Sequence, residues 1–148
     1  MANNKVNEQQ IIAFHLAIPV NDLALTRDFY INYLGCSVGR ESDKWIDFNF
    51  FGHQLSAHVK PEETRTVNTN IVDGEKIPVR HFGLVMEWEC WHQFVEDLEK
   101  QAVSFLIEPT IRFEGEIGEQ ATCFILDPSG NALEFKSFKS MEQLFANS

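Results

Sequence analysis

No stretch of this sequence is long and apolar enough to cross a membrane as a helix. The longest apolar runs, such as Ile11–Phe14 and Phe105–Ile107, fall far short of the roughly 20 residues that a helical span needs. The first residues, Met1–Lys5, also lack the apolar stretch of a signal peptide. We therefore expect a cytoplasmic protein that has no membrane partner.

Cysteine is scarce in the sequence. The three cysteines, Cys36, Cys90 and Cys123, form no CxxC pair and are odd in number. This pattern favours reduced thiols over a disulfide framework or a zinc site built from thiolates. Each cysteine is predicted to be a small residue of the core.

Clustered positive charge is missing as well. The chain has 12 Lys and Arg against 22 Asp and Glu, so its formal net charge is −10. Such a protein repels nucleic acid phosphates and anionic lipids. We expect no nucleic acid partner. A small-molecule substrate remains compatible with the charge, because a pocket can be locally basic within an acidic protein.

What the sequence does contain is enough apolar material for a folded domain. The 148 residues are 44% hydrophobic and 12% aromatic, as in soluble globular proteins. Residues 1–10 are polar and are predicted to be disordered, whereas residues 11–148 are predicted to form a single domain. The parts expected within it are module one at 11–60, a connection at 61–79, module two at 80–139 and a C-terminal tail at 140–148.

Module one is predicted to begin with a strand at residues 11–20. Apolar side chains alternate along it, so that Ile12 and Phe14 share a buried face and His15 lies on the opposite face. A helix capped by Asn21 or Asp22 should follow. The apolar stripe expected on this helix consists of Leu25, Phe29, Tyr33 and Leu34.

Three more strands complete module one, near residues 36–40, 45–50 and 53–59. Module two repeats the order. Its first strand, 81–86, alternates like the first strand of module one, and a helix follows with Trp91, Phe94, Val95 and Leu98 at helical spacing. The later strands are expected at 103–107, 121–126 and 133–138, with a charged loop or hairpin arm at 108–118. The predicted fold class is therefore α+β, made of two tandem βαβββ modules.

The two modules can be aligned as an internal repeat. The alignment places His15 opposite His81, and Ser56 opposite Glu134. A lone strand histidine is more often a hydrogen-bonded core residue, but two histidines at equivalent positions and a carboxylate on the closing strand indicate a metal site. The neighbours of Glu134 along its strand leave either face of the sheet open to its side chain.

These segments resemble the vicinal oxygen chelate superfamily, which includes glyoxalase I, extradiol ring-cleaving dioxygenases, fosfomycin-resistance transferases and bleomycin-binding proteins. The resemblance rests on Phe14–Leu23, Asp28–Cys36, His81–Leu84 and Asp127–Phe135. It implies two modules whose curled sheets form a half-open eight-stranded barrel with the helices outside. It also implies that His15, His81 and Glu134 match the metal ligands of the family, and that the protein is a homodimer.

Two imidazoles and one carboxylate leave about three open positions on an octahedral ion. The expected cofactor is Fe(II), with Mn(II), Ni(II) and Zn(II) as alternatives. His58 shares a strand face with Ser56 and is the candidate catalytic acid-base group, the alternative being a solvent-facing histidine. Ser56, Gln54 and Lys136 are the candidate substrate contacts.

The functional hypothesis is an extradiol dioxygenase-like oxidoreductase that acts on a small vicinal diol of the catechol type. A glyoxalase I-like lyase or isomerase is one alternative, although Ser56 stands where such relatives carry a glutamate ligand, and a serine is a poor ligand and base. A fosfomycin-type thiol transferase is another. A non-catalytic drug-binding protein, like those that bind bleomycin, is a third, against which the retained ligand set argues.

Overall fold

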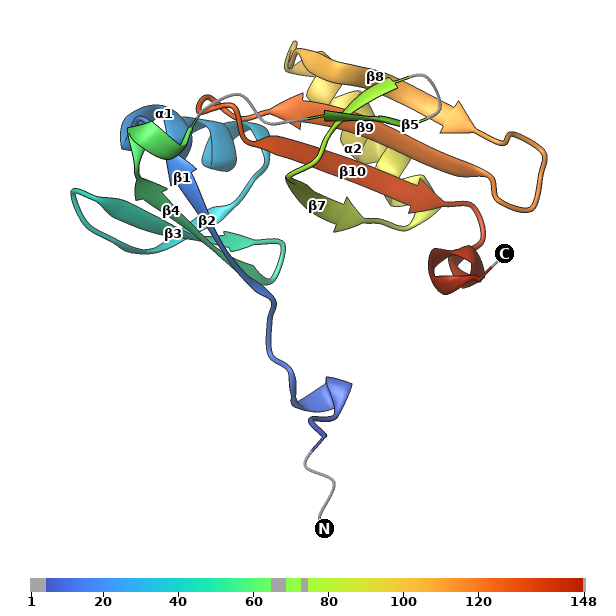
Figure 1. The fold of residues 1–148 in the computed structure, drawn as a ribbon, viewed down its shortest axis with the longest axis horizontal. Coiled ribbons are helices and arrows are strands. Elements are labelled where there is room, and N and C mark those ends of the chain that lie inside the picture. The colour runs from blue at the N-terminus through green and yellow to red at the C-terminus, as the bar shows by residue number, and fades with distance from the viewer. Residues whose placement is uncertain (1–4, 65–68, 73–74, 148) are drawn as a thin grey trace. The chain divides into compact units, whose positions relative to one another are not determined.

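The computed structural model describes residues 5–64, 69–72 and 75–147. The chain divides into two compact units, Met1–Glu63 and Thr64–Ser148, and each is described by itself. The predicted α+β fold with two βαβββ modules is confirmed, because each unit contains a four-stranded mixed sheet with a helical segment between the first two of its strands (Figure 1).

The first unit contains a sheet in the order β1-β4-β3-β2. Strand β1 runs parallel to β4, and the other neighbours are antiparallel. The strands are β1 (His15–Val20), β2 (Ser37–Glu41), β3 (Trp45–Phe50) and β4 (His53–Val59). A two-residue turn joins β3 to β4, with positive φ at Phe51 (52°) and Gly52 (91°), as tight hairpins require. The sequence predicted β3 and β4 at these positions.

Strand β1 is shorter than the predicted 11–20 segment. Ile12 and Phe14, expected on the buried face, are 98% and 64% exposed. The reason is the partner strand: β4 begins at His53, so that pairing with β1 starts at His15 opposite Gln54. The buried alternation begins only where this partner is present, and Ile18 and Val20 follow it.

The helical segment of the first unit has two parts, α1 (Leu23–Asp28) and the π-helical turn η2 (Phe29–Tyr33). Asp22 caps it as predicted, because its Oδ1 accepts the N–H of Leu25 at 2.9 Å. The predicted buried stripe is partly wrong, since Leu25 and Tyr33 are exposed and Thr26 and Tyr30 are buried instead. A π turn holds more residues than an α turn, which accounts for the burial of Tyr30 in place of Tyr33. Tyr30 packs on Phe48 of β3 with ring centroids 5.0 Å apart.

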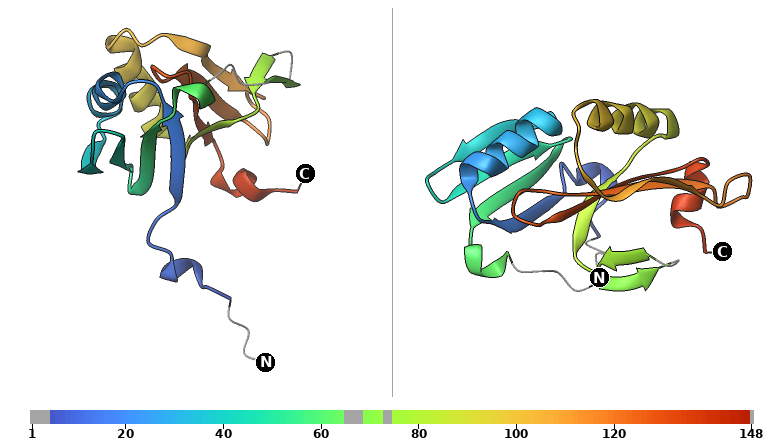
Figure 2. Two further views of the ribbon diagram at one scale, coloured as in Figure 1. Left: turned by 60° about the vertical axis from the view of Figure 1, so that its left-hand side comes forward. Right: turned by 90° about the horizontal axis from the view of Figure 1, so that it is seen from above.

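The second unit repeats this arrangement, with the sheet order β7-β10-β9-β8 and β7 parallel to β10. Its elements are β7 (His81–Val85), α2 (Trp88–Lys100), β8 (Phe105–Arg112), β9 (Gln120–Leu126) and β10 (Ala132–Phe138). Helix α2 lies along one face of this sheet (Figure 2). The predicted helix stripe is confirmed: Trp91, Val95 and Leu98 are buried, and Phe94 packs on Phe135 at 4.6 Å.

The turn between β9 and β10 is held by one side chain. Asp127 accepts hydrogen bonds from the backbone N–H groups of Ser129 and Asn131, both at 2.9 Å. Gly130 takes the positive φ (85°) that the turn needs. The turn fixes the residue at which β10 begins.

Three short helical segments and a hairpin lie outside the two modules. Asn7 caps η1 (Glu8–Gln10), and η3 (Pro61–Glu63) and η4 (Met141–Phe145) are also 3₁₀ turns. The prediction of disorder for residues 1–10 falls partly outside the described residues. Within the predicted connection, β5 (Thr69–Val72) pairs with β6 (Glu75–Pro78).

The segment 108–118 was predicted as a loop or hairpin arm. Its first residues belong to a strand instead, because β8 extends to Arg112. Glu119 holds the turn that follows. Its Oε1 accepts the N–H of Gly115 at 2.7 Å, and its Oε2 lies 3.3 Å from Nζ of Lys139. These contacts, led by the Gly115 hydrogen bond, hold the pKa of Glu119 below its ordinary value.

All three cysteines are free thiols. Cys36 and Cys123 are buried as predicted, and burial raises their pKa values to about 11 and about 12. The prediction was wrong for Cys90, which is exposed on α2. None of the helices in the described ranges is long and apolar enough to cross a membrane.

Gly83 provides a test of the second sheet. A Cβ atom at this position would lie 1.6 Å from the carbonyl oxygen of Glu134, so Gly83→Ala must push β7 away from β10. We expect a loss of about 3 kcal/mol in the free energy of unfolding, measured by urea denaturation. Gly39→Ala is the matched control, since its Cβ would meet no atom closer than 3.6 Å and should change stability by about 0.5 kcal/mol. Equal stabilities for the two variants would contradict this description of the β7–β10 contact.

Candidate functional site

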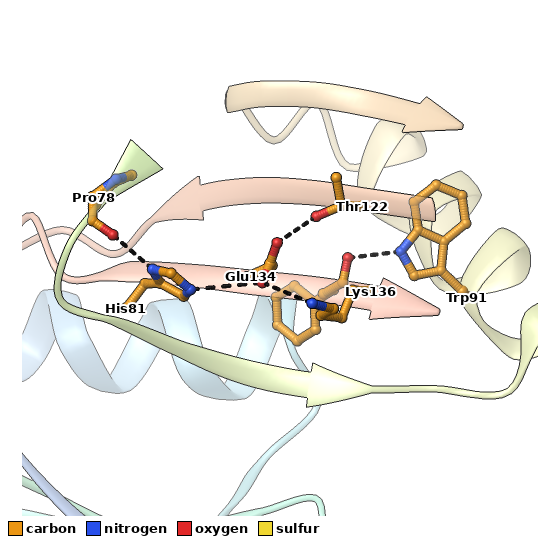
Figure 3. Close-up of polar contacts among 7 residues, drawn as sticks. Pro78, His81, Trp91, Thr122, Glu134 and Lys136 are labelled. Carbon is orange, nitrogen blue, oxygen red and sulfur yellow. Dashed lines mark hydrogen bonds and ion pairs between the residues drawn. The ribbon is translucent and has the colours of Figure 1, made fainter. Parts of the chain in front are cut away.

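His81 and Glu134 face each other across the parallel pair β7 and β10. The register places His81 opposite Ala132, and Gly83 opposite Glu134. Nε2 of His81 lies 3.6 Å from Oε1 of Glu134, as Figure 3 shows. Two atoms that each bind one ion at about 2.1 Å can be separated by up to about 4 Å. The two predicted ligands of the second unit are therefore close enough to share a metal ion.

The other ring nitrogen of His81 fixes the tautomer. Nδ1 lies 2.7 Å from the carbonyl oxygen of Pro78, and a carbonyl oxygen can only accept a hydrogen bond. Nδ1 therefore donates this hydrogen bond, and in the neutral imidazole the lone pair lies on Nε2, the nitrogen nearest Glu134. A histidine that donates through its second nitrogen to a carbonyl is the usual arrangement of a metal ligand. The ring also packs edge-on against Phe124, with centroids 5.1 Å apart.

Glu134 is held from two sides. Thr122 on β9 donates its hydroxyl proton to Oε2 at 2.7 Å, and Nζ of Lys136 lies 3.9 Å from Oε1. The side chain of Glu134 is only 17% exposed, so its carboxylate is oriented rather than free in water. The sequence left its face undetermined, and strand pairing now settles it: Glu134 and Lys136 lie on the face opposite Phe135, which packs against α2.

Helix α2 anchors β10 directly. Nε1 of Trp91 donates to the carbonyl oxygen of Phe135 at 2.8 Å, and Trp91 is buried (Figure 3). Phe135 is the residue between Glu134 and Lys136. The indole therefore fixes the backbone that carries both polar side chains.

The first unit carries the equivalent residues at the register that the repeat predicted. His15 pairs with Gln54, and Ala17 pairs with Ser56, as His81 pairs with Ala132 and Gly83 with Glu134. The alignment of Ser56 with Glu134 is thus confirmed by the geometry of the two sheets. His15, Gln54 and Ser56 share the face of their sheet that lies opposite Leu55 and the helix-packed Phe48.

Sequence reasoning missed Asp47 on β3. It lies directly opposite Ser56, and the Ser56 hydroxyl donates to its Oδ1 at 2.5 Å. Nε2 of Gln54 lies 3.5 Å from its Oδ2. The signal in the sequence was the two residues between the predicted strands 45–50 and 53–59, because a two-residue turn sets the register that places Asp47 opposite Ser56. Two of the predicted substrate contacts are hydrogen-bonded to this carboxylate.

The two remaining histidines of β4 differ in their surroundings. His58 is exposed and pairs with Trp45 and Pro19 on the same sheet face as Ser56. Its catalytic role remains a prediction. His53 lies on the opposite face, and its Nδ1 accepts the N–H of Phe14 at 3.0 Å. His53 therefore secures the chain immediately before His15.

Only two of the three predicted ligands are brought together. In the ranges that the structure describes, no three His, Cys, Asp or Glu side chains gather closely enough to hold a metal ion. His15 belongs to the first unit, and its participation remains a prediction. The donor set itself suits a divalent metal, because a neutral His81 offers the Nε2 lone pair and Glu134 an oriented carboxylate.

Known proteins share both the sequence pattern and the fold. Residues 12–135 match the model of the Glyoxalase/Bleomycin resistance protein/Dioxygenase superfamily. A solved structure described as a glyoxalase/bleomycin resistance protein/dioxygenase from Alicyclobacillus acidocaldarius is 32% identical, with a TM-score of 0.73, and the match covers 90% of this chain and 96% of that one. None of the curated proteins matches this chain.

Two more distant structures share the fold. A lactoylglutathione lyase from Agrobacterium tumefaciens is 16% identical with a TM-score of 0.59, and 85% of this chain and 92% of that one are covered. The genomically encoded fosfomycin resistance protein FosX from Listeria monocytogenes is also 16% identical, with a TM-score of 0.64 and coverage of 87% and 94%. Because the family model spans most of the residues and the bacterial relative exceeds 30% identity, the chain belongs to the Glyoxalase/Bleomycin resistance protein/Dioxygenase superfamily.

Proposed function

We propose that this protein is a metal-dependent enzyme whose ion is held by His81, Glu134 and His15. The observation that carries the proposal is the pairing of His81 and Glu134, 3.6 Å apart, with the remaining polar atoms of both side chains already engaged. A surface ion pair would not need a tautomer fixed by Pro78 and a carboxylate fixed by Thr122. A metal ligand pair needs both.

His15 is the third ligand because it occupies in the first unit the position that His81 occupies in the second. Fe(II) is the proposed metal, with Mn(II), Ni(II) and Zn(II) as alternatives, since two imidazoles and one carboxylate leave positions open. Held there, the ion would supply a Lewis acid and redox chemistry for the cleavage of a small diol by dioxygen.

The residues of this chain would bind and orient the substrate. Lys136 places a positive charge beside Glu134, where it can neutralise a diol oxygen that loses its proton. Gln54 and Ser56 offer hydrogen-bonding groups on the face that carries His15. His58, on the same face, is the proposed acid-base group for the later proton transfer.

A glyoxalase I-like lyase is the second candidate, and similarity to the lactoylglutathione lyase fold supports it. Ser56 counts against it, because a serine replaces the second carboxylate of the repeat and cannot serve as a comparable base. A fosfomycin-type transferase is a third, and the fold of FosX supports it to the same degree. A drug-binding protein without catalysis would not need the oriented His81–Glu134 pair.

The proposed setting is a cytoplasmic homodimer that acts on a small molecule. In a dimer, His15 could reach the His81–Glu134 pair of its own chain or of a second copy. Mixing a His15→Ala chain with a Glu134→Ala chain distinguishes the two arrangements, because only sites shared between chains would regain metal in the mixture.

The metal ligands can be tested by substitution. Protein purified without chelator should contain about one divalent ion per chain, and His15→Ala, His81→Ala and Glu134→Ala should each lose most of it, because each removes one of three ligands. The measurement is elemental analysis by plasma mass spectrometry. His92→Ala, in helix α2, is the matched histidine control. If the wild type and all three variants retain equal metal, the ligand set is wrong.

Thr122 should affect metal binding without touching the ion. Thr122→Val removes the hydroxyl that orients Glu134, and we expect the metal affinity to fall about tenfold. Competition with a chromophoric chelator measures this affinity. Thr110→Val is the control, because Thr110 pairs with Thr122 across β8 and β9 but donates its hydroxyl to the carbonyl of Glu108. A Thr122→Val protein with wild-type affinity would show that the hydrogen bond does not support a ligand.

Turnover distinguishes the candidate reactions. The Fe(II)-loaded protein should consume dioxygen in the presence of at least one member of a catechol panel, and yellow ring-opened products should accumulate. Loss of the hemithioacetal of methylglyoxal and glutathione, followed by absorbance, would support the lyase instead. Thiol consumption with fosfomycin would support the transferase. Each of the latter two results, without oxygen uptake, would contradict the dioxygenase.

A further inference from the structure

A row of small residues crosses the first sheet on its helix-free face. Ala17 of β1 pairs with Ser56 of β4, and Ser56 pairs with Asp47 of β3. Gly39 of β2 comes next, since a Cβ there would lie 3.6 Å from that of Asp47. Three of the four side chains in this row extend no further than a hydroxyl. Asp47 is therefore the largest side chain of this row, and its neighbours in the row are Ser56 and Gly39.

The Asp47 carboxylate is contacted by two neutral side chains of β4. Ser56 donates a hydrogen bond to Oδ1, and Nε2 of Gln54 lies 3.5 Å from Oδ2. None of the Lys and Arg ion pairs within the described ranges involves Asp47. A purely structural partner for the Ser56 hydroxyl could be a neutral amide. A carboxylate in this place retains the capacity to take a proton.

The corresponding position in the second unit is apolar. Phe124 pairs with Glu134 as Asp47 pairs with Ser56. Each sheet thus has one carboxylate on its helix-free face at this row, but on different strands. In the second unit this carboxylate is Glu134 on β10, the strand next to β7. In the first unit it is Asp47 on β3, which is separated from β1 by β4.

Ser56 connects Asp47 to the strand that carries His15. The serine is 5% exposed, and it lies between Asp47 on β3 and Ala17 on β1, two residues after His15. Its hydroxyl proton is engaged by Asp47, so an oxygen lone pair remains to accept a hydrogen bond from a bound molecule. The other titratable or charged groups facing this region are His15 on β1, His58 on β4 and Arg40, whose guanidinium carbon lies 5.4 Å from the Trp45 ring centroid.

We infer that Asp47, with Ser56 as its relay, is the base that accepts a proton from the substrate hydroxyl as a diol binds. This inference rests on the proposed metal-dependent function and adds a residue to it. The substrate O–H bond breaks and its proton passes to the Ser56 oxygen, while the Ser56 proton passes to Oδ1 of Asp47. The substrate becomes an oxyanion, Asp47 becomes a neutral acid, and the serine is regenerated. No oxidant or reductant is required for this step.

The test uses 4-nitrocatechol, whose visible absorption changes each time it loses a hydroxyl proton. It is bound to the full-length protein loaded with redox-inert Zn(II), and its spectrum is followed as a function of pH. Asp47→Asn should lower its affinity at neutral pH about tenfold and move the appearance of the doubly deprotonated spectrum upward by about one pH unit. Ser56→Ala should give a smaller shift in the same direction.

Two controls separate this role from a structural one. Asp43→Asn removes an exposed carboxylate from the turn before β3 and should leave the spectrum unchanged. Zinc content and thermal unfolding are measured for every variant, and Ser56→Ala stands in if Asp47→Asn does not fold. With Fe(II) and an active catechol, Asp47→Asn should also reduce kcat about a hundredfold.

The outcomes distinguish this inference from the function on which it rests. Wild-type spectra in both Asp47→Asn and Ser56→Ala, with the metal retained, would overturn the role of Asp47 alone. A wild-type protein that binds no metal would overturn the proposed function and this inference with it. A metal-loaded wild type that does not bind nitrocatechol would overturn the diol as substrate, and Asp47 would then have no hydroxyl to deprotonate.

Discussion

Strands β7 and β10 approach each other closely where Gly83 faces Glu134, and the candidate metal site depends on that contact. The space that a Cβ would need is occupied by the carbonyl oxygen of Glu134, so only glycine permits this pairing. The pairing brings His81 beside the carboxylate two residues along β10. Trp91 then fixes β10 from the opposite face through the carbonyl of Phe135. Backbone geometry thus places His81 and Glu134, two of the three proposed ligands, beside each other.

The two modules share a topology but differ in their chemistry. Both pair a histidine-bearing strand in parallel with the last strand of the module. The second module has a carboxylate on that last strand, held by Thr122, whereas the first has Ser56, held by Asp47. A duplicated fold would give two similar half-sites, and these substitutions place a carboxylate beside the histidine-bearing strand in the second module and a hydroxyl that donates to Asp47 in the first.

Period-two alternation and the internal repeat were sufficient to predict most of the fold and the equivalence of Ser56 with Glu134. Three features escaped prediction for physical reasons. The start of β1 depends on where β4 begins, which residues 11–14 do not encode. The π turn moved the buried stripe of the first helical segment towards Tyr30. Asp47 was overlooked because its partner, Ser56, belongs to another strand, and cross-strand partners follow from register rather than from local pattern.

The central claim is that two histidines, His15 and His81, bind one ion. Pulsed electron paramagnetic resonance of the protein loaded with Cu(II) tests it directly, because the remote nitrogen of each bound imidazole modulates the spin echo. We expect modulation from two imidazoles in the wild type and from one in either His15→Ala or His81→Ala. Modulation from a single imidazole in the wild type, or an unchanged pattern in His15→Ala, would contradict it.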